Sequence, residues 1–341
     1  MTGPFRRKPA GWAEWGNTIN QMRKHAHLHS RRGVCAAGAG FLCCLPQLRA
    51  VAALLRDQPL ALAEVAPGLF VSAGVHAEVM PANLGAIANL GVIVGDERVA
   101  VIDSGGCFLW GQRLREAIRR VTDRPIGVLV QTHMHPDHVF GAAAFREDRP
   151  RILGHRNLPG ALARREDYYV RRLQEILGDL AQGSAIVPPD ELVESALEID
   201  LGARVLTIRA HPPAHTDNDL SVFDEKTGTL WAGDLLFIDR VPALDGSLLG
   251  WLALLDELRR LPARRVVPGH GPASASWPNA LGAEERYLTL LRDEVRAVIR
   301  SGGTMEEAAA TVGRGEAGRW ALFDDYHARN VIAAFHELEW E

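Results

Sequence analysis

Three histidines and an aspartate lie close together in residues 131–138, which read QTHMHPDH. They follow the apolar run 126–130, which predicts a buried strand that ends in this loop. Imidazole and carboxylate groups are typical ligands of borderline divalent cations. In an extended loop, side chains two residues apart project to the same side, so His133 and His135 can share one ion. The spacing therefore predicts a metal site at the end of a strand.

Pro136 divides this cluster into two halves. A proline keeps the residue before it extended and is tolerated in the first turn of a helix. We therefore expect His135 to lie in the loop and a short helix to begin near Asp137. Asp137 and His138 then point at a neighbouring position, which makes two metals plausible.

Three further motifs follow downstream, each at the end of a strand-like run. They are AHTDND at 214–219 with His215, WAGD at 231–234 with Asp234, and PGHG at 268–271 with His270. Together with HMHPDH at 133–138 they resemble, in the same order, the signatures of the metallo-β-lactamase superfamily. The resemblance extends from about residue 64 to 275 and implies an α/β fold of the αββα sandwich type.

The resemblance also implies a ligand set for two metals, with zinc as the default and iron or manganese as less favoured alternatives. His133, His135 and His215 would bind the first metal, Asp137, His138 and His270 the second, and Asp234 would bridge the two. Two such cations lower the pKa of a shared water and polarise a substrate oxygen. The implied activity is a hydrolase in which a metal-bridging hydroxide attacks an ester, thioester, lactone or amide-type carbonyl of a small molecule. We expect Asp137 to be required for turnover.

Two positions bear on the ligand set and on the activity that the resemblance implies. His211 competes with His215, but only His215 is followed by a turn similar to the family's His-Thr/Ser-x-x-Asp, whereas His211 precedes two prolines and is interpreted as a strand-end residue. Many β-lactamases of this fold carry cysteine where this chain has Asp234, which makes an antibiotic hydrolase the weaker interpretation.

Within the superfamily, the chain is similar to the quinoprotein relay system zinc metallohydrolases, which are related to hydrolases of periplasmic sulfur oxidation. The phrases that carry this likeness are residues 87–91, 133–141, 212–219 and 337–341. The likeness implies a periplasmic accessory to quinoprotein dehydrogenases. Two other classes stay open: a non-catalytic metal- or cofactor-binding accessory protein, and an oxidoreductase similar to the mononuclear-iron persulfide dioxygenases.

The net charge of −4 is unevenly distributed over the 341 residues. Residues 1–52 hold eight Lys or Arg against the single acid Glu14, so the remaining chain has a net charge of −11. An acidic body argues against nucleic acid or an anionic membrane as a partner. Lys226 is the only lysine after Lys24 and lies in the turn-like sequence DEKTG, which argues against Schiff-base chemistry and a Walker-type phosphate loop.

Residues 1–52 are interpreted as an export signal region. Arg31-Arg32 precede the apolar stretch 33–45, which is too short to span a bilayer as a mature helix, and residues 50–52 offer a cleavage site near Ala52. The paired arginines favour twin-arginine export over the Sec route, with an uncleaved signal anchor as a further alternative. Because residues 1–21 are long for such a region, we predict that translation starts at Met22.

Apolar patterning predicts the remaining elements. Strands are expected at 64–72, 86–94, 98–102, 151–154, within 192–233 and at 265–268, and helices at 112–121, 139–145, 158–181 and 246–261. Further helices at 284–300, 304–312 and 319–338 predict a C-terminal helical region, 281–341, packed on a hydrolase domain at 64–280.

Several residues near these motifs have two possible roles. Asp103 is expected to shape the loop beneath the metal site rather than to be a ligand. Cys107 is interpreted as a buried filler rather than a pocket residue, and His155 either faces the cavity or caps the next helix. Tyr168 and Tyr169 are expected to pack in the core or against the C-terminal region rather than to form a wall of the pocket. The aromatic cluster at 320–327 is expected to pack the C-terminal helices on the sandwich rather than to line the substrate entrance.

Overall fold

The computed structural model describes residues 59–341. The export signal with Arg31-Arg32, the start at Met22 and the cleavage site near Ala52 lie outside the described residues. Within residues 59–341, no helix combines the length and the apolarity needed to cross a bilayer.

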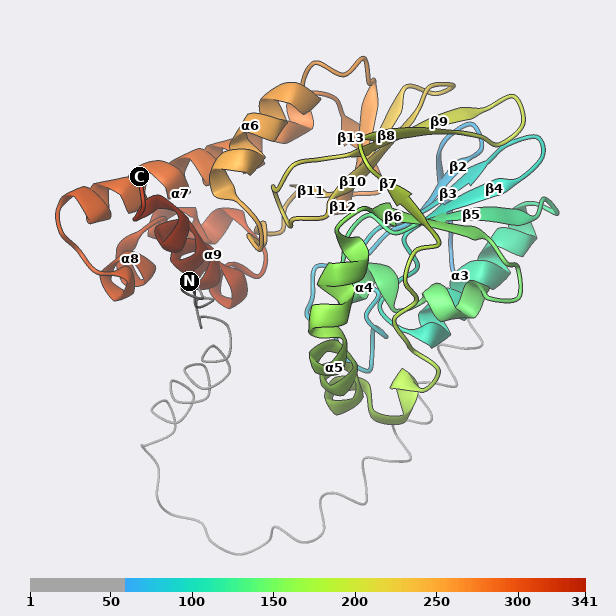
Figure 1. Ribbon diagram of the computed structural model, residues 1–341, viewed down its shortest axis with the longest axis horizontal. Helices are drawn as coiled ribbons and strands as arrows, with labels where there is room; N and C mark the ends of the chain where they lie inside the picture. Colours follow the sequence, from blue (N-terminus) through green and yellow to red (C-terminus); the bar gives the residue numbers. More distant parts are fainter. Residues whose placement is uncertain (1–58) are drawn as a thin grey trace, which may run out of the picture. The chain divides into compact units, whose positions relative to one another are not determined.

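Two β-sheets form the centre of the described part of the chain (Figure 1). The seven-stranded sheet runs in chain order, with antiparallel pairing from β1 to β4 and parallel pairing from β4 to β7. Its strands are β1 (Ala63–Ala66), β2 (Leu69–Ser72), β3 (Leu90–Val94), β4 (Val99–Ile102), β5 (Ile126–Val130), β6 (Arg151–His155) and β7 (Glu191–Val193).

The second sheet has six strands in the order β13-β12-β11-β10-β9-β8. All of its pairs are antiparallel except the parallel pair β11–β12. Its strands are β8 (Ala196–Asp200), β9 (Val205–Ala210), β10 (Leu220–Asp224), β11 (Thr229–Phe237), β12 (Arg265–His270) and β13 (Ala275–Ser276).

The inner faces of the two sheets share one apolar core, to which the first sheet contributes Ile102 and Val130 and the second Ile208 and Trp231. Every residue of β4 and of β11 is buried, as expected for strands covered on both faces. Strand β4 accordingly reads as a continuous apolar run, whereas β11 also buries two polar residues, Thr229 and Asp234.

Helices cover the outer faces of both sheets (Figure 1). Helix α3 (Phe108–Val121) and the 3-10 turn Ala142–Phe145 pack on the first sheet through Leu114, Ile118 and Phe145. Helices α6 (Leu248–Leu258), α7 (Gly282–Arg300), α8 (Met305–Thr311) and α9 (Phe323–Leu338) share a core cluster with the outer face of the second sheet. The predicted αββα sandwich with C-terminal helices is confirmed.

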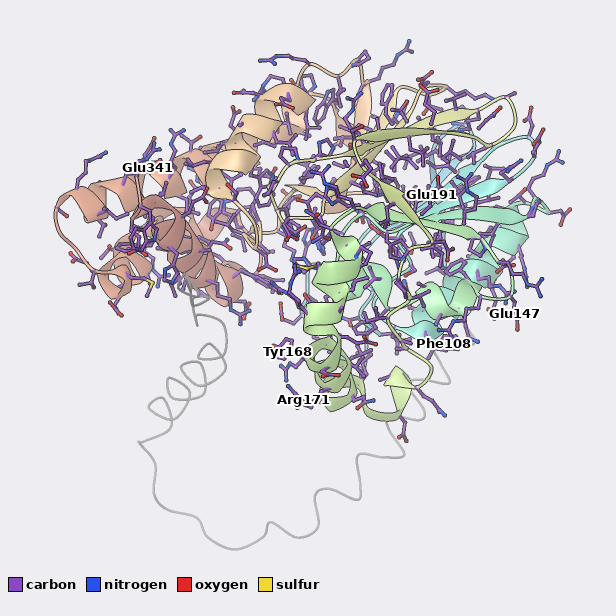
Figure 2. The ribbon with its side chains drawn as sticks, viewed as in Figure 1. Phe108, Glu147, Tyr168, Arg171, Glu191 and Glu341 are labelled. Carbon is purple, nitrogen blue, oxygen red and sulfur yellow. The ribbon has the colours of Figure 1, made fainter. Side chains whose placement is uncertain are left out.

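Helix α5 (Leu158–Leu177) lies over the loop that contains the central motif, and packs on it through Met134 and Val139. The two neighbouring tyrosines on this helix differ in burial. Tyr169 is buried, whereas Tyr168 is 57% exposed. Figure 2 labels Tyr168 on this helix. Core packing is therefore correct for the first and wrong for the second.

Several element boundaries differ from the prediction: the last helix begins at Phe323 rather than near Arg319, and the helix expected at 139–145 is a 3-10 turn over Ala142–Phe145. Helix α3 begins at Phe108 rather than near Gln112, and β3 begins at Leu90 rather than near Ala86. The strand starts late because Asn89 turns toward β12: its side-chain amide donates to Pro268 O at 2.9 Å, and its backbone N–H donates to Gly269 O at 2.7 Å. This link fixes the end of β12, which carries His270.

Candidate metal centre

The seven predicted ligands come from four separate segments of the chain and lie together. Four belong to the loop after β5 and to the short helix α4 (Pro136–Val139), one to the β9–β10 loop, one to β11 and one to the end of β12. Their potential ligand atoms form two groups, and within each group the atoms lie within 4.8 Å of one another. The first group is His133, His135, His215 and Asp234, and the second is Asp137, His138 and His270.

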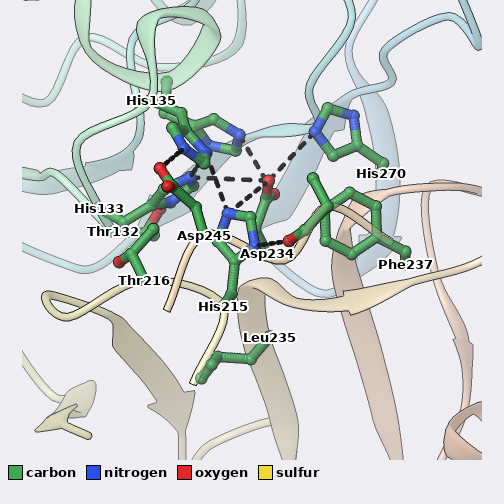
Figure 3. Close-up of polar contacts among 12 residues, drawn as sticks. Thr132, His133, His135, His215, Thr216, Asp234, Leu235, Phe237, Asp245 and His270 are labelled. Carbon is green, nitrogen blue, oxygen red and sulfur yellow. Dashed lines mark hydrogen bonds and ion pairs between the residues drawn. The ribbon is translucent and has the colours of Figure 1, made fainter. Parts of the chain in front are cut away.

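Three imidazole nitrogens converge in the first group (Figure 3). His135 Nδ1 lies 3.0 Å from His133 Nε2 and 3.0 Å from His215 Nε2. His133 and His215 are buried, and His135 is the more exposed of the three. Whether these nitrogens bond to one another or to a cation depends on where each ring carries its proton.

The partners of the outer nitrogens assign those protons. His215 Nδ1 lies 2.6 Å from the carbonyl oxygen of Ala243, and His135 Nε2 lies 3.2 Å from Asp245 Oδ2. Both partners only accept, so each ring must donate there and has an unprotonated nitrogen inside the group.

The same holds for His133. The Thr132 hydroxyl donates to Asp103 Oδ2 at 2.8 Å and accepts from His133 Nδ1 at 3.0 Å. His133 Nε2 is then unprotonated and carries a lone pair as well. Three lone pairs that converge at about hydrogen-bond distance repel one another unless a cation lies between them, so these residues fit a metal ion.

The second group has the same arrangement. His138 Nδ1 donates to Asp103 Oδ2 at 2.8 Å, and His270 Nδ1 donates to Ile87 O at 2.7 Å. The inner nitrogens lie 3.6 Å (His138) and 3.4 Å (His270) from Asp137 Oδ2. His138 Nε2 is buried and has no hydrogen-bond partner among the described residues. A buried nitrogen and a carboxylate without a donor between them fit a second cation.

The charges around His138 favour a positive ion at this position. Burial acts to lower the pKa of His138, but the carboxylates of Asp234, Asp103 and Asp137 outweigh it and raise the pKa well above its ordinary value. In the first group the opposite holds, because burial lowers the pKa of His215 to about 3. His215 is therefore neutral, which is the form that binds metals.

Asp234 lies between the two groups (Figure 3). Its Oδ2 is 3.6 Å from His133 Nε2, 3.4 Å from His215 Nε2 and 3.3 Å from His270 Nε2, while its Oδ1 is 3.2 Å from His138 Nε2. Burial acts to raise the pKa of Asp234, but the imidazoles of His270 and His138 hold it well below its ordinary value. The carboxylate stays ionised and reaches both groups, as a bridging ligand must.

Two glycines allow Asp234 to reach this place. Gly233 interrupts β11 with a φ of +54°, in the left-handed region that favours glycine, and the pairing with β12 shifts there. A Cβ at Gly269 would collide with Asp234 Oδ1 and with the backbone of Gly233. The carboxylate thus occupies space that any side chain at position 269 would need.

Asp103 lies beneath both groups. It has a φ of +60°, accepts hydrogen bonds from Thr132 N and Oγ1 and contacts His138 Nδ1. Its carboxylate thus orients two imidazoles from behind, as expected for a loop-shaping residue that is not itself a ligand.

The other candidates lie outside the two groups. His211 contacts Ser221 Oγ through Nε2 at 2.7 Å, and His155 Nδ1 accepts from Asn157 N at 3.0 Å just before α5. The Cys107 thiol donates to Leu84 O at 3.2 Å, and burial raises its pKa to about 11. Cys107 is therefore a buried filler that stays protonated.

The sequence did not predict that the segment 239–247, which follows β11, contacts the candidate ligands. Asp245 contacts His135 and forms an ion pair with Arg165, and these partners hold its pKa at about 2 although burial acts to raise it. The carbonyl of Ala243 contacts His215. The segment has no motif and no apolar periodicity, and a backbone carbonyl leaves no signal in a sequence.

Comparison with known proteins agrees with this fold and site. The Metallo-beta-lactamase superfamily model matches residues 85–270, more than half of the chain and the whole span of the seven candidate ligands. The chain belongs to the metallo-β-lactamase superfamily. Members that resemble it include sulfatases and lactamases, which are hydrolases.

Three similar proteins illustrate the range. A linear primary-alkylsulfatase of Pseudomonas sp. (strain ATCC 19151) is 23% identical over 240 residues, which cover 60% of this chain and 44% of that protein. The structure of the sec-alkylsulfatase Pisa1 of Pseudomonas sp. matches with a TM-score of 0.63 at 17% identity. The match covers 86% of this chain and 52% of the Pisa1 chain. The structure of a metallo-β-lactamase of Pontibacter korlensis matches with a TM-score of 0.55 at 18% identity, and the match covers 67% of this chain and 99% of the lactamase chain. The chain spans less than half of the curated sulfatase, and the two structures show the shared fold alone.

Proposed function

We propose that this chain is a metal-dependent hydrolase that binds two divalent cations, with zinc as the default. The observation that carries the proposal is the convergence of three unprotonated imidazole nitrogens, from His133, His135 and His215, beside the Asp234 carboxylate. His133, His135 and His215 would hold one cation, Asp137, His138 and His270 the other, and Asp234 would contact both.

Two bound cations would supply a nucleophile from water at neutral pH and would polarise an oxygen of the substrate. The chain's own residues would keep the site rigid and set its access. The outer imidazole nitrogens are held by Asp103, Asp245 and two backbone carbonyls, which fixes the ring orientations. The side chains of Asp137 and His135 are 13% and 18% exposed, whereas those of the other candidate ligands are at most 3% exposed. Substrate would therefore approach from the side of Asp137 and His135.

The substrate class proposed from the sequence is an ester, thioester, lactone or amide-type carbonyl compound. The names of two similar proteins add alkyl sulfate esters to this set. All of them place a polarisable oxygen next to the atom that water attacks, so one site chemistry serves each.

The test begins with metal analysis of the purified, unchelated full chain. We expect about two zinc ions per chain, since each group holds a full set of ligands. The zinc-loaded protein is then screened against thioesters, lactones, cephalosporins and alkyl sulfates. Asp137→Ala should abolish turnover of any substrate found, whereas Asp256→Ala, on the exposed side of α6, should not change it.

Fewer than one metal ion per chain would refute the proposed function. Iron together with oxygen uptake would replace the hydrolase with an oxidoreductase. Full metal content and an unchanged cellular role in the Asp137→Ala strain would instead favour a non-catalytic metal-binding accessory.

We also propose that the protein is exported to the periplasm by the twin-arginine route and serves a quinoprotein dehydrogenase or sulfur-oxidation system. The support is the sequence of residues 1–52 and the likeness of the phrases at 87–91, 133–141, 212–219 and 337–341. Cell fractionation of the wild type and of a chain with Arg31 and Arg32 changed to Lys tests the route, because the lysine pair should retain the protein in the cytoplasm.

A further inference from the structure

We propose that Asn330, on helix α9, is a positioning residue for the metal centre, and that it acts through the backbone of the segment 239–247. The inference goes beyond the proposed function, because Asn330 lies 60 residues after the end of the family match at residue 270. It gives the C-terminal helical region a part in organising the site in addition to its packing.

The segment 239–247 contacts three candidate ligands on the ring nitrogen that faces away from the metal groups. Ala243 O accepts from His215 Nδ1 at 2.6 Å, and Asp245 Oδ2 accepts from His135 Nε2 at 3.2 Å. Arg240 Nη1 lies 3.0 Å from His270 Nδ1 but is not its hydrogen-bond acceptor, because that nitrogen donates to Ile87 O and a guanidinium only donates. Partners at this position set the tautomer and the direction of a metal-binding imidazole. The segment therefore controls two imidazoles of the first group and borders one of the second.

The segment itself has no regular secondary structure between β11 and α6. Its ends are held by backbone hydrogen bonds, from Val241 N to Ala321 O at 3.1 Å and from Asp245 N to His215 O at 2.9 Å. Its middle, where the Ala243 carbonyl turns to His215, has no strand beside it. Something else must orient that carbonyl.

The side chain of Asn330 supplies the hydrogen bonds to the backbone that a neighbouring strand would otherwise make. Its Nδ2 donates to Pro242 O at 2.6 Å, and its Oδ1 accepts from Leu244 N at 2.9 Å. These two bonds hold the peptide groups on both sides of Ala243, so the direction of the Ala243 carbonyl is fixed between them. Asn330 is 1% exposed, which means that water cannot replace either bond without a rearrangement.

Other residues on the same side of α9 form hydrogen bonds with the two ends of the segment. Tyr326, Asn330 and Glu337 are spaced by four and seven residues, which places them along one side of a helix. Arg240 Nη2 donates to Tyr326 OH at 3.2 Å, and Glu337 accepts from Ser247 Oγ at 2.6 Å and from Leu248 N at 2.6 Å. Because one rigid helix holds the segment at three points, the three outer contacts move together.

A matched control lies on the other side of Asn330. Tyr287 OH accepts from Asn330 Nδ2 at 3.0 Å and contacts His327 Nδ1 at 2.9 Å, and neither of these hydrogen bonds is to the segment. Tyr287→Phe therefore disturbs the same buried network without loosening the Ala243 carbonyl directly. Asn330→Leu removes both bonds to the segment, and Asn330→Asp keeps the acceptor for Leu244 N but loses the donor to Pro242 O.

The experiment measures the zinc dissociation constants of the folded full-length chains by competition with a chromophoric chelator. It also records the visible absorption of the cobalt(II)-loaded proteins, which reports ligand geometry, and the free energy of unfolding in urea. Changes in such outer partners typically weaken metal binding about 10- to 100-fold, so we expect at least a tenfold weaker first-group affinity and an altered cobalt spectrum in Asn330→Leu. Asn330→Asp should lie between this variant and the wild type. Tyr287→Phe should lose stability but keep the affinity and the spectrum.

Wild-type affinity and spectrum in both Asn330 variants would overturn the proposal, as would an equal loss in Tyr287→Phe, which would indicate general loosening of α9. If Asn330→Leu does not fold, the comparison of Asn330→Asp with Tyr287→Phe decides the same question. A wild type that holds no zinc overturns this inference together with the proposed function, whereas tight wild-type binding with unchanged variants overturns this inference alone.

Discussion

At the scale of single residues, the space taken by Asp234 depends on the absence of a side chain at position 269. We predict that Gly269→Ala weakens zinc binding at least tenfold, because the added methyl group would collide with Asp234 Oδ1 and push this carboxylate away from the candidate ligands around it. Zinc competition with a chelator measures the effect. Gly282→Ala is the control, since a Cβ at Gly282, in the first turn of α7, meets nothing within 4 Å. Equal affinities in the two variants would contradict the prediction.

A second residue-scale prediction concerns His211, which is 5% exposed. Burial, together with the nearby charges of Arg209 and His155, lowers the pKa of His211 to about 4. Its folded pKa is therefore below that of an exposed histidine, about 6.5. The stability that a neutral His211 contributes is complete above pH 6.5 and is lost as the pH falls toward 4, up to about 3 kcal/mol.

His211→Gln removes this titration. We expect the free energy of unfolding in urea to fall less steeply between pH 7 and pH 4.5 in the variant than in the wild type. The difference between the two chains isolates His211 from the other histidines that titrate in the same range. Parallel pH profiles would show that His211 is not buried in its neutral form.

At the scale of elements, one buried arginine joins the two sheets. Arg204, in the turn between β8 and β9, forms a bidentate ion pair with Asp224 of β10 at 2.7 Å and 3.0 Å. Its third nitrogen donates to Pro67 O, in the turn between β1 and β2, at 3.1 Å and to Val94 O, at the end of β3, at 2.9 Å. The pair holds the ends of the two sheets together from inside, where its side chains are only 2% and 1% exposed.

We predict that Arg204→Met destabilises the protein by about 3–5 kcal/mol, because it leaves the Asp224 carboxylate buried without its partner. The double variant with Asp224→Leu should recover part of the loss, and urea unfolding measures both. Arg172→Met, which breaks an exposed pair with Glu175 on α5, should cost less than about 1 kcal/mol. A loss in Arg204→Met as small as in Arg172→Met would refute the prediction.

At the scale of the whole molecule, the C-terminal helices complete the core of the second sheet. Trp251 of α6, Tyr287 of α7 and Phe335 of α9 belong to one buried cluster that also contains residues of β11 and β12. Its apolar surface would face water without residues 281–341.

We therefore predict that a chain that ends at residue 280 is insoluble or lacks a cooperative unfolding transition. Solubility and circular dichroism on heating measure the outcome. A chain without residues 1–52 is the control, because the sequence assigns them to an export signal, and it should unfold as the full chain does. Cooperative unfolding of residues 1–280 would show that the sandwich folds without α7–α9.

The sequence by itself determined the types and order of the candidate ligands and the class of fold. His133, His135, Asp137 and His138 are close in the chain, and of the others His215 follows an apolar strand, Asp234 lies within one and His270 ends one, so local spacing and strand patterning were sufficient. The boundary of β3 was not predicted, because Asn89 leaves the strand to bond with residues 179 positions away.

Only the tertiary structure decided which groups orient those ligands. Ala243, Asp245 and Asn330 have no pattern of their own, and their partners lie 28 residues (His215), 110 residues (His135) and 86 residues (Leu244) away in the chain. Contacts of that range arise when α9 docks on the segment 239–247, and a backbone carbonyl contributes to them regardless of its side chain. The candidate ligands could thus be read from residue types, whereas the hydrogen bonds that orient their side chains depend on how distant segments pack.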